Sequence, residues 1–362
     1  MKIVQLAVYD TNIGDSIAIK AIRNRFEKYC NEPVEWVDLN LIKHFYRSGN
    51  DIKKSKQVLK NFTEKADLLI VGGCGLIEGA GWNNMKTGWK LPFNHETMDS
   101  IKCPVVAFGL GANFFRKMPT LTEKGSKALQ EFINKCEIFS VRNDGSYEVL
   151  TQMGFTDIEE VPDGGIIYSP ERIIDDKQKV ENIIFNPTFN NNMEINKGRN
   201  MDTPTKKGLM EKMKGKNIKY FAHTPKSYTG WKGNYLFGSS TLISGLKLEN
   251  VDKYIDDNYG VKFDGIVTMH GHGQLIAFGK NVPVISLATQ DKNVGFCKKY
   301  DLMDYLVDSQ DNNWVESLFE KMNKLQNDSE YLKKWYEIRH KHYGKIIDIF
   351  DNMIKRTVEV AA

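Results

Sequence analysis

Cysteine is scarce in this sequence, and no two cysteines are spaced as a pair. The five side chains are Cys30, Cys74, Cys103, Cys136 and Cys297. Zinc sites and redox pairs are usually marked by CxxC spacing, and disulfide frameworks by an even number of cysteines. The sequence therefore argues against both classes and favours a reducing compartment.

Long apolar runs are also absent. A membrane-spanning helix needs about 18 or more consecutive apolar residues, and the chain contains no such run. The apolar start of the chain is interrupted at Gln5 and ends before Asp10, which is too short for a signal peptide. We therefore expect a cytoplasmic protein whose first residues form a strand.

An excess of charge of one sign is the third missing feature. Lys and Arg number 50 and Asp and Glu number 46, which gives a net charge of +4. A nucleic-acid-binding domain is normally far more basic, so nucleic acid is not an expected partner. What the chain does have is 362 residues, 41% of them hydrophobic, which is enough for about two packed domains.

Short apolar runs alternate with amphipathic stretches along the chain. The strand candidates are Ile3–Val8, Asp67–Val71, Val105–Phe108, Ile138–Val141, Ile158–Val161, Ile183–Phe185, Ile218–Phe221, Gly265–Thr268, Val282–Leu287 and Tyr305–Val307. The helix candidates are Ser16–Cys30, Leu121–Asn134, Leu242–Asn258 and Leu318–Ile354, the last as one or two helices. This alternation predicts an α/β fold with parallel sheets covered by helices on both faces. We predict two Rossmann-like, doubly wound domains, residues 1–172 and 180–362, because Pro170 and a charged cluster separate two apolar strands.

The first candidate site follows the first strand. Ligands of open parallel sheets bind at the carboxyl ends of the strands, in the loops that lead to helices. The loop from Asn12 to Ser16 is the first of these, and Asp15 or Ser16 would cap the next helix. The free amides of that helix could hold an anion. The alternative is a helix cap and nothing more.

The second candidate is a glycine-rich loop. Five glycines occur in the ten residues from Gly72 to Gly81, with Gly73 and Gly75 among them. Glycines let the backbone come close to a ligand and present its amides. The spacing matches neither the dinucleotide motif nor the P-loop, so the ligand stays open.

Two further strands end in charged residues. Arg142 presents five fixed donors, suited to a two-pronged grip on phosphate or carboxylate. Its alternative role is an ion pair with a neighbouring carboxylate. Asp163 is a candidate base, or simply a turn-former beside Gly164.

The strongest candidate is His270-Gly271-His272-Gly273, which follows a strand and begins a helix that ends at Gly279. His270 and His272 cannot share a helix face, but in a loop they can converge on an anion or take acid–base roles. The alternative is two loop histidines without chemistry. Lys292 follows the next strand and adds a cation. No third ligand is evident near the histidines, so we predict neither a metal nor a cofactor.

The remaining candidates concern a second substrate. Tyr228 and Trp231 lie in a long irregular segment, residues 186–238, and could offer faces for sugar stacking; local packing is the alternative. His95 begins a short motif that lacks the second histidine of a zinc-protease helix.

Taken in order, these loops resemble the polysaccharide pyruvyl transferase family. The matching segments are Asn12-Ile13-Gly14-Asp15, Val71-Gly72-Gly73-Cys74-Gly75, Phe108-Gly109-Leu110-Gly111, Ser140-Val141-Arg142, Val161-Pro162-Asp163 and residues 270–283. The resemblance implies a fold like that of two-domain, GT-B-like glycosyltransferases, with the active site in the cleft between the domains. It also implies transfer of a pyruvyl group from phosphoenolpyruvate to two hydroxyls of one sugar, which forms a cyclic ketal.

The resemblance also implies roles for the residues. His272 is then the general acid, Asp163 or Asp15 the base, and His95 an outside candidate for the base. The donor is expected to be held by Asn12, Gly73, Gly75, Arg142, His270, Gly273 and Lys292, and the acceptor by His95, Tyr228 and Trp231.

One position departs from the family pattern. The family usually has Arg-x-His-Gly where this chain has His270-Gly271-His272-Gly273, and a histidine is a weaker and conditional cation. A nucleotide-sugar glycosyltransferase is therefore a first alternative, with the diphosphate at the helix N-terminus. A non-catalytic glycan-binding protein of the same fold is a second alternative.

The resemblance implies an acceptor among surface glycans or their precursors, which places the protein at the inner face of a membrane. Basic residues of the terminal helix could dock it there; they are Lys333, Lys334, Arg339, Lys341 and Lys345. The alternative is an ordinary solvated helix face. The sequence leaves the oligomeric state open.

Overall fold

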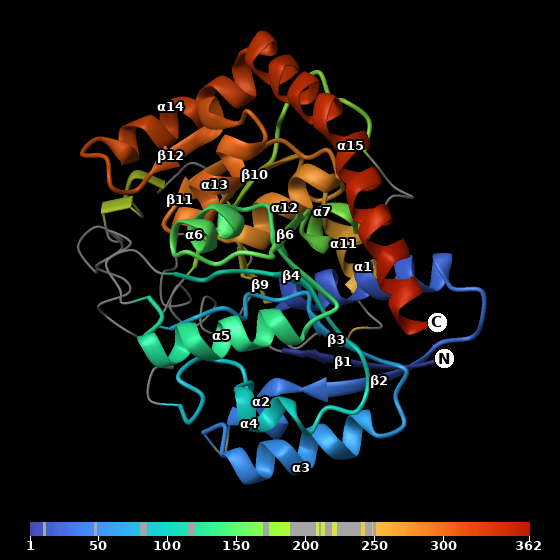
Figure 1. The fold of residues 1–362 in the computed structure, drawn as a ribbon. Helices are drawn as coiled ribbons and strands as arrows, with labels where there is room; N and C mark the ends of the chain where they lie inside the picture. The colour runs from blue at the N-terminus through green and yellow to red at the C-terminus, as the bar shows by residue number, and fades with distance from the viewer. Residues whose placement is uncertain are drawn as a thin grey trace.

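The computed structural model describes residues 1–9, 12–46, 49–79, 85–114, 120–168, 174–188, 208–209, 211–213, 219–222, 240–242, 248 and 251–362. Two six-stranded parallel sheets organise these residues (Figure 1). The predicted α/β class with parallel sheets is therefore confirmed.

The first sheet has the strand order β2-β1-β3-β4-β5-β6. Its strands are β1 (Lys2–Ala7), β2 (Glu35–Asn40), β3 (Leu68–Gly72), β4 (Val105–Leu110), β5 (Ile138–Arg142) and β6 (Glu159–Val161). The central strands β3, β4 and β5 are buried along their whole length, as expected for a parallel sheet covered on both faces. The edge strand β2 was not predicted, because most of its side chains are at least partly exposed and it has no apolar run.

The second sheet has the order β12-β11-β10-β7-β8-β9. Its strands are β7 (Ile183–Asn186), β8 (Lys219–Ala222), β9 (Ser240–Leu242), β10 (Gly265–Thr268), β11 (Val284–Ala288) and β12 (Leu306–Asp308). The prediction of a helix beginning at Leu242 was wrong, because that residue ends β9. The chain passes from the first sheet to the second between β6 and β7, and the boundaries at residues 172 and 180 stay a prediction.

Helices connect the strands and cover the sheets. The helices of the first half are α1 (Ile13–Tyr29), α2 (Leu41–His44), α3 (Ile52–Thr63), α4 (His95–Met98), α5 (Glu123–Lys135), α6 (Ser146–Gln152) and α7 (Gly164–Ile167). Those of the second half are α11 (Val251–Asn258), α12 (Gly271–Gly279), α13 (Asp291–Lys299), α14 (Trp314–Asn327) and α15 (Ser329–Ala361), with a 3-10 turn at Met303–Tyr305. No described helix combines the length and apolar character needed to cross a membrane.

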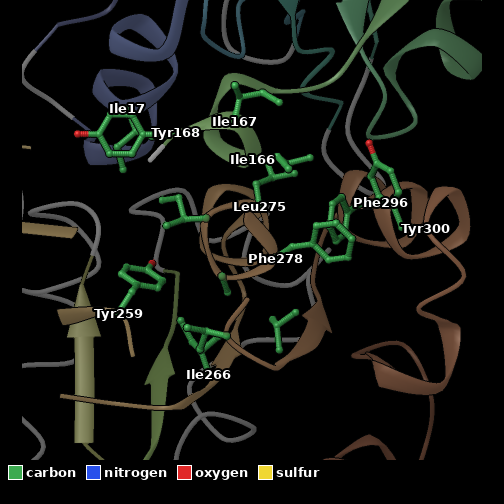
Figure 2. Packing of buried hydrophobic residues seen from close by; sticks show 14 of the residues in the cluster. Ile17, Ile166, Ile167, Tyr168, Tyr259, Ile266, Leu275, Phe278, Phe296 and Tyr300 are labelled. Carbon is green, nitrogen blue, oxygen red and sulfur yellow. The ribbon is translucent and has the colours of Figure 1, made fainter. Parts of the chain in front are cut away.

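The short helix α7 joins the two halves. Figure 2 shows its residues Ile166 and Ile167 between Ile17 of α1 and Leu275 of α12. All of these side chains belong to one buried cluster that continues through both halves. Glycine allows the contact: a Cβ on Gly279 would lie 2.2 Å from the Ile166 carbonyl oxygen. The loops of both halves are therefore held in fixed contact near α7.

The terminal helix α15 begins in the second half and returns to α1 (Figure 1). Asp351 on α15 pairs with Arg25 of α1 at 3.2 Å, and the Tyr29 hydroxyl donates to the same carboxylate at 2.6 Å. Arg356 of α15 also forms two hydrogen bonds to Glu159 of β6, at 2.5 and 2.8 Å. The C-terminal helix thus ties the second half to the first.

The terminal helix does not present the predicted set of basic residues to a membrane. Arg339 is buried and donates to the carbonyl oxygens of Phe278 and Gly279, at 3.2 and 2.9 Å. Its inclusion as a docking residue was wrong. The other side chains include Lys334, paired with Asp304, and Lys341, paired with Asp301; Lys333 lies 3.9 Å from Glu337. These carboxylates offset the positive charge that docking would use.

Candidate active site

Four loops that follow strands meet at one point. Gly14 follows β1, Arg142 ends β5, Asp163 follows β6, and His272 follows β10. Arg142 Nε lies 2.6 Å from Asp163 Oδ2, which lies 3.6 Å from His272 Nε2. The His272 ring lies against the backbone of Gly14. The structure therefore brings together residues from four of the loops that the sequence proposed as parts of one site.

Arg142 and Asp163 form a buried ion pair. The Arg142 Nε–H donates to the Gly109 carbonyl at 3.2 Å, and Nη2 donates to the Gly73 carbonyl at 3.1 Å. Asp163 caps α7, because its Oδ1 accepts from the Gly165 amide at 2.7 Å. The alternative role that the sequence left open for each residue therefore occurs: Arg142 pairs with a neighbouring carboxylate, and Asp163 forms a turn beside Gly164.

The pair fixes the ionisation of both groups. Burial alone would raise the pKa of Asp163, but the charges of Arg142 and His272 outweigh it and hold that pKa well below its usual range. Burial alone would lower the pKa of Arg142, but Asp163 raises it above its ordinary value. Asp163 is therefore an ionised carboxylate at neutral pH, and a carboxylate of such low basicity is a weak general base.

One polar atom at the centre of the cluster has no close partner. Asp163 Oδ2 is paired with Arg142 Nε at 2.6 Å, whereas His272 Nε2 is buried, lies 3.6 Å from Asp163 Oδ2 and forms no hydrogen bond among the described residues. Buried polar atoms of proteins are normally hydrogen-bonded. His272 Nε2 therefore keeps a hydrogen-bonding capacity that the described residues do not use.

His272 is positioned by its contact with α1. A Cβ on Gly14 would lie 2.1 Å from His272 Cγ, so only glycine at position 14 lets the ring lie there. The N-terminus of α1 is capped by Asn12, whose side chain accepts from the Gly14 amide at 2.9 Å. Asp15 lies in the first turn of the same helix and is partly exposed. The prediction that Asp15 or Ser16 caps this helix was wrong, because the helix begins at Ile13, three residues before the predicted start at Ser16.

The glycine loop after β3 is held by cations through its carbonyl oxygens. Arg142 binds the Gly73 carbonyl, and Lys90 Nζ donates to the Gly75 carbonyl at 3.0 Å. Gly73 has φ +82°, in the region that favours glycine. Lys90 also pairs with Glu78 at 3.0 Å; burial lowers the Lys90 pKa, but Glu78 outweighs this and raises it above its ordinary value. Lys90 and Glu78 were not identified from the sequence. They bind each other, and Lys90 also binds a backbone oxygen, and neither contact leaves a sequence motif.

His270 precedes α12 and forms its N-cap, but its side chain caps no amide. Its Nε2 lies 2.9 Å from the Pro187 carbonyl oxygen, which can only accept, so Nε2 carries the proton in this bond. The His270 amide donates to Thr268 Oγ1 at 3.0 Å. A Cβ on Gly273 would lie 2.2 Å from that same oxygen, so Gly273 allows the first turn of α12 to approach Thr268.

Lys292 connects the second half with the glycine loop. Its Nζ donates to Asn113 Oδ1 at 3.0 Å, and Asn113 Nδ2 donates to the Gly75 carbonyl at 3.1 Å. Its Cε lies 3.1 Å from the position of a Cβ on Gly271. Lys292 therefore lies beside the first turn of α12, and its role in donor binding stays a prediction.

The predicted acceptor residues are not gathered at this point. His95 is exposed at the start of α4, where its amide donates to Glu131 of α5 at 2.8 Å. It lines a hollow of about 380 Å³ that is bordered by α5 and includes none of Arg142, Asp163 and His272. The roles of His95 as acceptor ligand or base stay predictions. Tyr228 and Trp231 lie outside the described residues.

A metal site is not formed by the part of the chain that the structure describes. No three His, Cys, Asp or Glu side chains within it are grouped so that they could hold a metal ion.

Three solved structures with a similar fold contain UDP or UDP-GlcNAc. The UDP-GlcNAc 2-epimerase of Neisseria meningitidis bound to UDP-GlcNAc is 13% identical, with TM-score 0.55, and the match covers 96% of this chain and 98% of that one. The S. aureus MnaA–UDP structure is 12% identical, with TM-score 0.54 and coverage of 96% and 97%. The Methanocaldococcus jannaschii UDP-GlcNAc 2-epimerase in complex with UDP-GlcNAc and UDP is 14% identical, with TM-score 0.52 and coverage of 94% and 100%. The chain therefore has the fold of two Rossmann-like domains that defines GT-B-like enzymes.

The family model described as polysaccharide pyruvyl transferase matches residues 12–291. This chain therefore belongs to the polysaccharide pyruvyl transferase family, as its loops predicted. Among curated proteins, no sequence matches the chain.

Proposed function

We propose that this protein transfers the pyruvyl group of phosphoenolpyruvate to two hydroxyls of one sugar of a surface polysaccharide or its precursor. The observation that carries the proposal is the buried cluster in which Asp163 Oδ2, paired with Arg142 Nε at 2.6 Å, lies 3.6 Å from His272 Nε2, which has no hydrogen-bond partner among the described residues. The family match over residues 12–291 supports the same reaction.

His272 is the general acid of the proposed reaction. Its Nε2 proton passes to the methylene carbon of phosphoenolpyruvate, and positive charge develops on the carbon that bears the phosphate. Asp163 lies beside the ring as a fixed anion, with its Oδ2 3.6 Å from His272 Nε2. The ion pair with Arg142 keeps Asp163 charged, so Asp163 orients His272 rather than acting as the base.

The two sugar hydroxyls then complete the ketal. The first attacks the cationic carbon, and the second displaces inorganic phosphate from the same carbon. Of the two hydroxyl protons, one restores the acid and the other leaves with phosphate. Asp15 is our candidate base, because it is a partly exposed carboxylate in the first turn of α1, next to the residue that contacts His272.

The donor carries a phosphate and a carboxylate, which need cations and amides. Lys292 and the first turns of α1 and α12 supply them in this arrangement. Arg142 Nε and Nη2 are engaged with Asp163 and two carbonyl oxygens. We therefore assign Arg142 to the support of Asp163 and of the Gly73 carbonyl, and the donor anion to the surrounding groups.

A nucleotide-sugar glycosyltransferase is the second candidate, and one observation favours it. The His270 ring binds the Pro187 carbonyl instead of capping α12, and an uncapped helix N-terminus suits a diphosphate. The enzymes of similar fold described above bind UDP or UDP-GlcNAc. A glycosyl donor would also have no need of an arginine at position 270.

Donor binding separates the two candidates. We would measure the binding of phosphoenolpyruvate and of a panel of UDP-sugars by calorimetry, on the wild type and on His272→Ala. His340→Ala is the matched control, because His340 is half-exposed on α15 and pairs with Asp176. We expect phosphoenolpyruvate to bind all three proteins, and phosphate release with a sugar acceptor to fall about 100-fold or more only in His272→Ala. Binding of a UDP-sugar without phosphoenolpyruvate would contradict the proposal and favour the glycosyltransferase.

A further inference from the structure

A hollow of about 620 Å³ lies between α6 of the first half and α13 of the second. The first half contributes Ala112, Phe114 and the start of α6 around Ser146, and the second half contributes one face of α13. Pockets for small molecules typically enclose about 300–1,000 Å³. The hollow is therefore large enough for one or two sugar rings.

The hollow borders the candidate active site. Lys292 lines it, and Lys292 Cε lies 3.1 Å from the position of a Cβ on Gly271, the residue before His272. Ala112 also lines it and follows Gly111, where a Cβ would lie 3.2 Å from Arg142 Nη1. A molecule bound in the hollow would thus lie next to the loops that carry Arg142 and His272.

The wall on the side of the first half is built of fixed polar groups. Ser146 Oγ accepts from the Ala112 amide at 2.9 Å and donates to Asp144 Oδ1 at 2.5 Å. Ser146 and Asp144 are both buried. Side chains held in this way keep their positions when a ligand binds, which lowers the entropic cost of binding.

The charges of the lining are balanced. Lys292, Lys298 and Lys299 stand against the carboxylates of Asp144, Glu148 and Asp291, and Phe114 and Val149 add apolar surface. An anionic ligand would face three carboxylates as well as three lysines, one of which, Lys299, is already paired with Glu160. A neutral sugar would be matched better, because its hydroxyls can donate to carboxylates and accept from lysines while its C–H faces contact Phe114 and Val149.

We infer that this hollow binds the acceptor: an uncharged sugar unit of the glycan, held between α6 and α13. The inference rests on the proposed function for the identity of the reaction, and it replaces the sequence-predicted acceptor residue His95. Neither hollow is lined by Arg142, Asp163 or His272. The hollow between α6 and α13 is lined by Lys292, whose Cε lies 3.1 Å from the position of a Cβ on Gly271, the residue before His272.

The test measures sugar binding and donor binding separately. The probes are the methyl glycosides of galactose, glucose, mannose and N-acetylglucosamine, observed by saturation-transfer NMR, and phosphoenolpyruvate, observed by calorimetry. Val149→Trp fills the hollow, and Lys298→Glu changes its charge at an exposed position. Val261→Trp is the matched control, because Val261 is 75% exposed and does not line the hollow.

We expect at least one glycoside to bind the wild type and Val261→Trp, and its affinity to fall about tenfold or more in Val149→Trp and Lys298→Glu. Phosphoenolpyruvate should bind all four proteins alike. Undiminished glycoside binding in both hollow variants would overturn the inference, as would a wild type that binds phosphoenolpyruvate but none of the four glycosides. If the glycoside signal is lost in the hollow variants but no protein binds phosphoenolpyruvate, the sugar site stands and the proposed function fails.

Discussion

The imidazole of His272 lies directly over the backbone of Gly14. A Cβ on Gly14 would be 2.1 Å from His272 Cγ and 2.2 Å from Nδ1, closer than any side chain allows. Gly14 belongs to the first turn of α1 and His272 to the first turn of α12. The two halves of the molecule thus meet at the ring that we assign as the acid.

Gly14→Ala tests whether this contact sets the rate. The added methyl group must displace the ring from Asp163, and a displacement of about 1 Å can cost about 100-fold in rate. We expect phosphate release to fall by that order while phosphoenolpyruvate still binds. Gly344→Ala on α15 is the matched control, since nothing lies within 4 Å of its Cβ position. A wild-type rate in Gly14→Ala would refute the assigned position of His272.

Asp163→Ala tests the buried ion pair through stability. The change leaves the Arg142 charge buried without its partner at 2.6 Å, and breaking a buried pair in this way costs about 3–5 kcal/mol. We expect a marked fall in melting temperature. Asp311→Ala, at an exposed position, provides the control. An unchanged melting temperature in Asp163→Ala would mean that water or another group compensates Arg142.

The same pair predicts how stability depends on pH. The pKa of Asp163 is lowered in the folded protein, so the unfolded chain takes up the proton first, near the ordinary aspartate pKa of about 3.9. The stabilisation is therefore complete above that pH and declines as the pH falls below it toward the folded-state pKa. In melting experiments between pH 7 and pH 3, the wild type should lose stability more steeply than Asp163→Asn. Parallel curves for the two proteins would contradict the lowered pKa.

Lys90 and Glu78 provide a second buried pair, at 3.0 Å. Lys90→Met removes the cation that also holds the Gly75 carbonyl and leaves Glu78 buried without it. We expect a loss of about 3–5 kcal/mol, part of which Glu78→Gln should restore in the double variant because the unpaired charge is gone. Melting temperatures of the wild type, both single variants and the double variant form the cycle. Strictly additive effects would show that the two side chains are not coupled.

The sequence predicted the fold because buried parallel strands are continuous apolar runs. Strands β3 and β10 were found within a residue or two of their bounds for this reason. Strand β2 was missed because it lies at the sheet edge, where Glu35 and Asp38 are exposed and no apolar run is needed.

The site was predictable only in part. Arg142, Asp163 and His272 were found because each follows or ends an apolar strand, and parallel strands bring their carboxyl ends to one edge. The ion pair between Asp163 and Arg142 forms because β5 and β6 are neighbours in the sheet. No sequence pattern shows which strands are neighbours. Lys90 was missed because a lysine that binds a backbone carbonyl carries no motif.

His270→Arg tests the departure from the family pattern. The His270 ring donates to the Pro187 carbonyl through Nε2, so its second nitrogen is an acceptor while the ring is neutral, and an acceptor repels an anion. Arginine is charged at every working pH and has enough donors for the carbonyl and an anion together. We expect phosphoenolpyruvate to bind about tenfold more tightly to His270→Arg at pH 8. Calorimetry at pH 8 measures the gain, with His340→Arg on α15 as the matched control. Weaker binding at pH 8 would instead mean that the site requires a neutral residue at position 270, as a different donor would.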